Sequence, residues 1–158
     1  MLDGVIAESG AQAEDFWRIR ETLPEAQKYE GISIKHDIAV PVSRVADFME
    51  QASAQVEKAV PGIRICAFGH VGDGNMHFNL AQPEGADGPA YKARQEEINR
   101  LVHDVVTSMG GSISAEHGIG RLRKEELAHY GSDIGLDLMR RIKATLDPDS
   151  LMNPGKVI

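Results

Sequence analysis

Apolar residues recur at the spacing of an amphipathic helix in five segments of the chain. In residues 43–60, for example, Phe48 and Val56 fall on one face, and Ser43 is in position to cap the helix. Pro24 is expected to end the first helix, because proline removes a backbone donor. The predicted helices cover residues 12–22, 43–60, 90–109, 122–130 and 134–146.

Four shorter segments favour β-strands, because their apolar residues alternate and turn residues border them. They cover residues 32–40, 63–69, 75–81 and 112–115. In chain order the elements from residue 32 are strand, helix, strand, strand, helix and strand. This order is typical of a ferredoxin-like α+β domain, in which helices cover an antiparallel sheet with the split βαβ arrangement. The sequence therefore predicts one such domain over residues 1–158, with extra C-terminal helices.

The dipeptide Asp73-Gly74 separates two of the predicted strands and favours a two-residue hairpin turn. With these residues as the turn, the strands pair so that His70 lies opposite His77. Both imidazoles then share a sheet face with Asn79, and opposed Cβ atoms lie about 4.5 to 5.5 Å apart. The other face is expected to pack in the core through Ile65, Ala67, Val71, Met76, Phe78 and Leu80.

The paired histidines favour a metal site. A single strand histidine is more often a hydrogen-bonded residue, but two opposed imidazoles can share one divalent cation through bonds of about 2.0 to 2.1 Å. Glu116 follows the last predicted strand and could bring a carboxylate to the same surface. Two histidines and one carboxylate with open positions are typical of catalytic zinc or ferrous sites. Three histidines lack such neighbours and are interpreted as surface or packing residues: His36, His103 and His129.

Composition narrows the functional classes. A net charge of -7 and a pI near 5.3 argue against a nucleic-acid surface, which needs a basic face. The sequence contains no apolar run of bilayer-spanning length, and its start lacks the basic and apolar blocks of a signal peptide. We therefore expect a cytoplasmic protein without a transmembrane segment. Cys66 is the single cysteine, so no internal disulfide can form, and we interpret it as a buried thiol.

Three motifs carry a family resemblance. They are GHVGDGNMHFNL at residues 69–80, SAEHGIGRLRKEEL at residues 114–127 and MRRIKATLDPDSLMNPGK at residues 139–156. Together they make the chain, from about Phe16 to its end, similar to the C-terminal domain of FAD-linked oxidases. This family includes D-lactate dehydrogenases, the flavin subunit of glycolate oxidase and D-2-hydroxyglutarate dehydrogenases.

The resemblance implies roles for the matching residues. Three of them are expected to hold a divalent metal, Zn or Mn: His70, His77 and Glu116. His117 is the expected catalytic base. Three more are expected to bind the substrate: Arg20, Lys35 and Asn79. Asn153, in the terminal NPGK, is expected to approach the flavin.

The resemblance also implies what these residues lack. Whole family proteins begin with an FAD-binding domain, and this sequence contains neither that domain nor a GxGxxG motif. FAD is therefore expected to bind mainly to that other domain of the same protein, and the 158 residues alone to be inactive. Some members use a hydroxyl-bearing residue four positions after the arginine for substrate. This chain has Pro24 there, which favours a different acid.

The implied reaction oxidises a small 2-hydroxy acid of the D-lactate, glycolate or D-2-hydroxyglutarate type to the 2-oxo acid. In the complete enzyme, the metal would lower the pKa of the hydroxyl group, His117 is expected to accept its proton, and the flavin would receive the hydride. Two alternatives remain open. One is a metal-dependent hydrolase in which His117 activates water, and the other is a noncatalytic module that binds a metal or an acid or forms a homodimer. The flavin's electron acceptor could hold the whole enzyme peripherally at the inner membrane.

Overall fold

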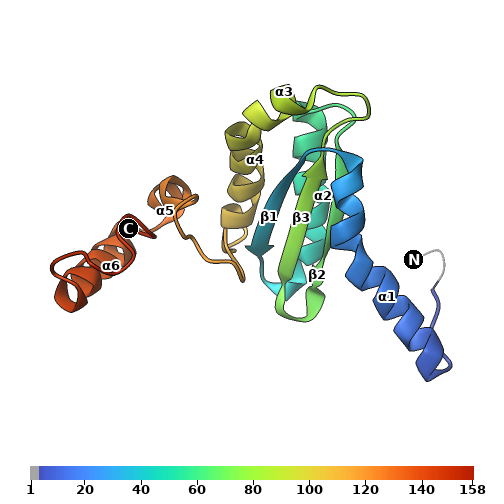
Figure 1. The fold of residues 1–158 in the computed structure, drawn as a ribbon, viewed down its shortest axis with the longest axis horizontal. Coiled ribbons are helices and arrows are strands. Elements are labelled where there is room, and N and C mark those ends of the chain that lie inside the picture. Colours follow the sequence, from blue (N-terminus) through green and yellow to red (C-terminus); the bar gives the residue numbers. More distant parts are fainter. Residues whose placement is uncertain (1–3) are drawn as a thin grey trace.

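The computed structural model describes residues 4–158 and has the expected α+β architecture. At its centre is a three-stranded antiparallel sheet in the order β1-β3-β2. The strands are β1 (Ser33–Ala39), β2 (Arg64–His70) and β3 (Asn75–Ala81). Two helices, α2 (Val45–Ala59) and α4 (Gln95–Ser108), cover one face of this sheet (Figure 1).

The covered face of the sheet forms the hydrophobic core with α2 and α4. Phe48 of α2 meets Phe78 of β3 edge to face, with ring centroids 5.3 Å apart, and both side chains are fully buried. Successive side chains of a strand point to opposite faces. Because Phe78 points into the core, its neighbours His77 and Asn79 lie on the other face of the sheet. The fold thus separates the core from the face that carries the candidate chemistry.

The fourth predicted strand is reduced to a single bridge. Ser112 pairs with Ala39, the last residue of β1. This bridge lies next to β1 at the edge of the sheet, where a ferredoxin-like fold has its fourth strand. The Ser112 hydroxyl then bonds the backbone of Ser114, and this local bond competes with further pairing. The backbone N–H of Ala115 donates to the Asp37 carbonyl at 3.1 Å, so the chain stays against β1 up to Glu116.

The hairpin register differs from the prediction. β2 pairs with β3 so that Phe68 lies opposite His77 and His70 lies opposite Asn75. The prediction that His70 faces His77 is therefore wrong by two residues, although both stay on the same sheet face. The connection is longer than two residues. It is a 3-10 turn over Val71–Asp73 followed by Gly74, whose φ of 77° is left-handed.

Two contacts stabilise this longer turn. The Asp73 carboxylate accepts the backbone N–H of Asn75 at 3.0 Å, and the Gly74 carbonyl accepts that of Val40 at 3.1 Å. Val71 consequently lies in the turn with 56% of its surface exposed. The prediction that Val71 packs in the core is wrong for this reason.

Helix α1 (Gly10–Ala26) runs through Pro24, so the predicted end before this proline is wrong. Pro24 falls in the last helical turn, where it removes only one backbone hydrogen bond. A 3-10 turn, Gln27–Glu30, follows directly. It buries Gln27 against the sheet, where the Gln27 side chain accepts a hydrogen bond from Asn79 at 2.9 Å.

Two further helix predictions need correction. The expected single helix over residues 90–109 is divided at Arg94 into α3 (Gly88–Ala93) and α4. The break lets buried Tyr91 reach the Leu80 carbonyl with its hydroxyl at 2.8 Å. Ser43 does not cap α2, because it lies within the 3-10 turn that precedes this helix.

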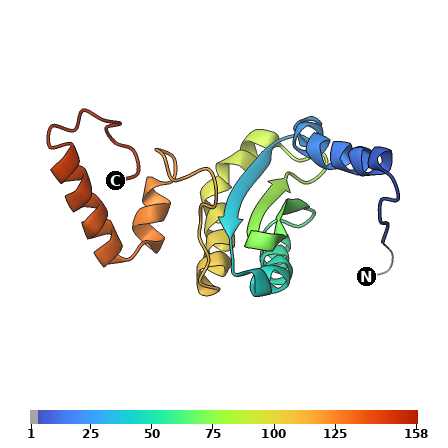
Figure 2. The same ribbon diagram turned by 90° about the horizontal axis from the view of Figure 1, so that it is seen from below.

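The C-terminal helices match the prediction closely. They are α5 (Lys124–Tyr130) and α6 (Asp133–Leu146), and both lie beyond α4, on the opposite side of the sheet from the start of α1 (Figure 2). α5 is joined to α4 by a hydrogen bond between buried Glu126 and His103. Within residues 4–158, no helix is both long and apolar enough to cross a membrane.

Candidate metal and substrate site

A cavity of about 220 Å³ opens on the face of the sheet opposite α2 and α4. Pairing within the sheet places its strand residues beside one another, because Asp37 faces His77 and Lys35 faces Asn79 across β1 and β3. The segment after the fourth-strand bridge adds His117. The residues that line the cavity are Pro24, Lys35, His36, Asp37, Phe68, His77, Asn79, His117 and Arg123.

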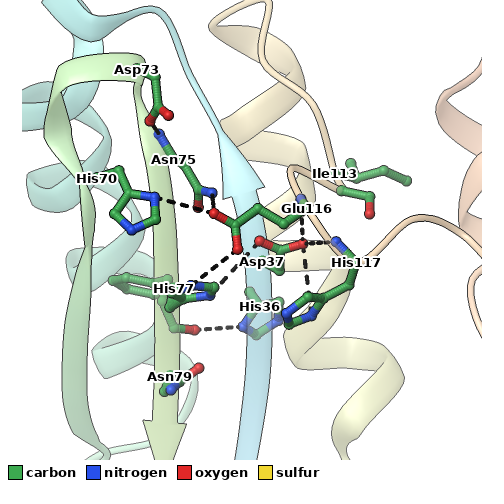
Figure 3. Close-up of polar contacts among 12 residues, drawn as sticks. His36, Asp37, His70, Asp73, Asn75, His77, Asn79, Ile113, Glu116 and His117 are labelled. Atoms are coloured by element: carbon green, nitrogen blue, oxygen red, sulfur yellow. Dashed lines mark hydrogen bonds and ion pairs between the residues drawn. The ribbon is translucent and has the colours of Figure 1, made fainter. Parts of the chain in front are cut away.

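Glu116 lies between the two histidines of the hairpin (Figure 3). Its Oε1 is 3.2 Å from Nδ1 of His70, and its Oε2 is 3.9 Å from Nε2 of His77. Asn75 donates from Nδ2 to Glu116 Oε1 at 2.5 Å, which fixes the carboxylate at the end of β3. The two histidines expected to hold a metal therefore both approach the carboxylate of Glu116, the third expected ligand, even though they are not directly opposed to each other.

Asp37 is a site residue that the sequence reasoning missed. Its carboxylate Oδ2 accepts the backbone N–H groups of Glu116 and His117 at 2.9 and 2.8 Å. Its side chain also approaches two rings, because Asp37 Oδ1 is 3.8 Å from His77 Nδ1 and Oδ2 is 3.8 Å from His117 Nδ1. The available signal was a carboxylate inside a predicted strand, where a buried charge is costly unless it is paired.

Electrostatics keep Asp37 charged inside the sheet. Burial alone raises the pKa of its carboxyl group. The backbone N–H groups of His117 and Glu116, together with the rings of His117 and His77, outweigh burial and hold the pKa below its usual range. Asp37 therefore presents a negative charge to both histidines.

His117 lies at the mouth of the cavity. Its ring stacks on that of His77 with centroids 5.8 Å apart and an interplanar angle of 28°. Asp37, His77 and His117 each offer a ligand atom within 4.8 Å of the others, so these three could also surround a cation. The side chain of His117 is 62% exposed, which leaves it accessible to a small molecule.

The residues expected to bind substrate are only partly brought together. Lys35 and Asn79 line the cavity, but Arg20 and Asn153 do not. The Arg20 guanidinium lies 4.5 Å above the ring of Phe68, which is itself a cavity residue. Asn153 lies in the C-terminal segment and lines a separate depression against α6.

Arg123 is a second cavity residue that the sequence reasoning missed. It donates from Nη1 to the Ile113 carbonyl at 3.3 Å and to the Ser114 hydroxyl at 3.2 Å. Among residues 4–158 it forms no ion pair. Its place six residues after His117 in the GIGRLR segment was the available signal, but spacing alone does not show which side of the loop an arginine occupies.

The whole chain matches one family of protein domains. A model of the C-terminal domain of FAD linked oxidases covers residues 1–157. The chain belongs to this family. The cluster of Glu116, His117 and the hairpin histidines lies within the residues matched to this FAD linked oxidase C-terminal domain.

Individual relatives are dehydrogenases. The chain is 36% identical over 157 residues to D-2-hydroxyglutarate dehydrogenase of Stutzerimonas stutzeri, covering 99% of the chain and 34% of that protein. It is 39% identical over 156 residues to D-2-hydroxyglutarate dehydrogenase of Xanthomonas citri pv. viticola, covering 98% and 33%. It is 30% identical over 157 residues to D-lactate dehydrogenase of Anaerostipes hadrus, covering 99% and 32%. The chain thus spans about a third of the length of these curated relatives.

The donor set of this FAD linked oxidase domain fits a divalent metal. Glu116 has a carboxylate oxygen 3.2 Å from an imidazole nitrogen of His70 and another 3.9 Å from one of His77, and imidazole and carboxylate groups are the ligands that bind zinc at about 2.0 to 2.2 Å. The group whose ligand atoms all lie within 4.8 Å of one another is a different one, Asp37, His77 and His117, and Oδ1 of Asp37 is buried without a hydrogen-bond partner among the described residues. The cavity is too small for a flavin, since pockets for molecules of drug size start at about 300 Å³.

Proposed function

We propose that the chain is the substrate side of an FAD-dependent dehydrogenase or oxidase. The reaction is the oxidation of a small 2-hydroxy acid, of the D-2-hydroxyglutarate, D-lactate or glycolate type, to the 2-oxo acid. One observation carries the proposal. Glu116 touches both hairpin histidines, while the adjoining His117 faces the same cavity as Lys35 and Asn79.

The proposed metal ligands are His70, His77 and Glu116, with Zn²⁺ or Mn²⁺ as the ion. A bound divalent ion supplies positive charge that lowers the pKa of a hydroxyl group near it. His70 and Glu116 have exposed side chains, with relative exposures of 58% and 43%, so this side of the site is open to a substrate. Three protein ligands leave coordination positions free.

His117 is the proposed base. Its exposed ring can accept the proton of the substrate hydroxyl group, and the negative charge of Asp37 beside it stabilises the imidazolium that forms. Lys35 and Asn79 line the cavity and are placed to bind the substrate carboxylate and hydroxyl oxygens. Arg20 is a flexible side chain over Phe68, and we propose that it turns towards the cavity when an anion enters.

FAD, when bound, accepts the hydrogen of substrate C2 with its two electrons. The relatives are about three times as long as this chain. We propose that most of the flavin is held by the part of the whole protein that corresponds to the other two thirds of these relatives. Asn153 in the C-terminal segment is the residue of this chain proposed to approach it. Under this arrangement the 158 residues orient the acid and remove its proton, and they do not oxidise it alone.

Complementation tests the proposed function. The chain is coexpressed with the N-terminal part of the Xanthomonas citri relative, and the purified assembly is mixed anaerobically with D-2-hydroxyglutarate, D-lactate or glycolate. The expected result is bleaching of the flavin absorbance by at least one of these acids. His117→Ala should slow bleaching by about 10² to 10⁴-fold without displacing the flavin. Binding of an acid and Zn²⁺ with no bleaching would favour the noncatalytic module instead.

A further inference from the structure

Asp37 lies where the hairpin and the Glu116-His117 segment meet (Figure 3). Its side chain is 2% exposed, and its Oδ2 accepts two backbone N–H groups of that segment. Its Oδ1 is buried without a hydrogen-bond partner among the described residues, and it is 3.8 Å from Nδ1 of His77. A buried carboxylate oxygen is destabilising without a donor, and the nearby nitrogen of His77 can supply one.

The two ring nitrogens of His77 consequently face two different carboxylates. Nδ1 is 3.8 Å from Asp37, and Nε2 is 3.9 Å from Oε2 of Glu116. A histidine binds a given cation through one nitrogen only. On the Glu116 side the side chains of His70 and Glu116 are exposed, whereas on the Asp37 side Oδ2 already accepts two backbone N–H groups and the Asp37 side chain is buried. A cation on the Glu116 side would bind Nε2, and Nδ1 would then keep its proton and face Asp37.

We propose that Asp37 is a positioning residue that holds His77 in the Nδ1–H tautomer, so that Nε2 is free for a metal ion. The same carboxylate anchors the segment that carries Glu116 and His117. Pairing of a ligating histidine with a carboxylate fixes the ring and raises its basicity. The role of Nε2 rests on the proposed function, whereas the tautomer is a property of the chain itself.

Asp37→Asn separates the two tasks of the carboxylate. The amide oxygen can still accept the backbone N–H groups of Glu116 and His117, so the segment stays anchored. The amide NH₂ group then faces Nδ1 of His77, and it can only donate. Nδ1 must become an acceptor, which moves the proton to Nε2 and blocks that nitrogen as a ligand.

Ring ¹⁵N shifts of His77, measured by NMR on the 158-residue chain without metal, report the tautomer. The His77 signals are assigned by their loss in His77→Gln. We expect the Nδ1–H form in the wild type and in the control Asp47→Asn, whose carboxylate pairs with Arg44 on the surface. Asp37→Asn should show the Nε2–H form. Its affinity for Zn²⁺ alone, measured by competition with a chelator, should fall by about 10 to 100-fold.

An Nε2–H form in the wild type would overturn the proposal, and this result does not depend on the variant folding. An unchanged tautomer in a folded Asp37→Asn chain would overturn it as well. If Zn²⁺ affinity were lost while the tautomer stayed the same, Asp37 would be a direct ligand. A wild type that shows the expected tautomers but binds no Zn²⁺ would instead contradict the metal in the proposed function and leave the role of Asp37 standing.

Discussion

Glu126 of α5 and His103 of α4 form a buried hydrogen bond of 2.6 Å between carboxylate Oε2 and ring Nδ1. The other carboxylate oxygen of Glu126 is 3.1 Å from Nε of Arg100. Burial lowers the pKa of His103, and the hydrogen bond and charge of Glu126 act against that shift. The pair therefore connects α5, the helix that follows the Glu116-His117 segment, to α4 and through it to the core.

Removing Glu126 is expected to destabilise this junction. Glu126→Ala leaves the buried ring of His103 and the guanidinium of Arg100 without their carboxylate, which should cost about 3 kcal/mol. Urea unfolding measures the loss. The exposed neighbour Glu125 provides the control, because Glu125→Ala should change stability by less than about 0.5 kcal/mol. Equal effects of the two substitutions would contradict the proposed role of the pair.

Stability should depend on pH through His36. Burial lowers the pKa of this histidine to about 4, although its Nδ1 donates to the Phe78 carbonyl at 2.9 Å. The unfolded chain binds the proton near the ordinary pKa of 6.5. The contribution of His36 to stability is therefore complete above pH 6.5 and is lost as the pH falls towards 4, by about 3 kcal/mol.

Urea unfolding at a series of pH values tests this dependence. His36→Gln removes the titrating group, so the decline in stability between pH 6.5 and 4 should become shallower. The exposed His129, replaced by glutamine in the same way, is the control. Parallel curves for the wild type and His36→Gln would show that the buried ring is not the cause.

Metal content should separate ligands from the base. His70→Ala, His77→Ala and Glu116→Ala each remove a proposed ligand and should weaken Zn²⁺ binding by more than the roughly 100-fold that loss of a supporting residue costs. His117→Ala should leave Zn²⁺ content near that of the wild type. Elemental analysis with competition titration gives the answer. Equal metal content in the wild type and both hairpin histidine variants would exclude the proposed metal site. Loss of metal in His117→Ala would show that His117 is a metal ligand and not the base.

The hairpin turn depends on Gly74. Its φ is 77°, and a Cβ atom there would lie 1.9 Å from the Val40 carbonyl oxygen. Gly74→Ala should therefore cost on the order of 2 kcal/mol or more, because both strain and a clash with backbone are introduced. Gly72 is a matched control two residues away, since a Cβ atom at Gly72 meets nothing within 4 Å. Similar unfolding midpoints for Gly72→Ala and Gly74→Ala would contradict the left-handed turn.

The sequence alone predicted the α+β class, all three strands of the sheet and the separation of its two faces. These features depend on local periodicity: alternation places Phe78 in the core and His77 outside whichever register the hairpin adopts, because a shift of two residues preserves the face. The sequence also predicted that Glu116 comes close to the hairpin histidines, and its carboxylate does lie beside both of them.

Tertiary structure decided which of these residues touch. The register depends on Gly74, whose carbonyl bonds Val40 from a distant part of the chain, and a local turn rule cannot include that contact. The same holds for Pro24, which stays helical while the following residues pack on the sheet, and for Asp37, which is a site residue because two N–H groups far along the chain bond to it. Side-chain periodicity is a short-range property that sequence carries directly, whereas hydrogen bonds between distant segments form only once the chain has folded.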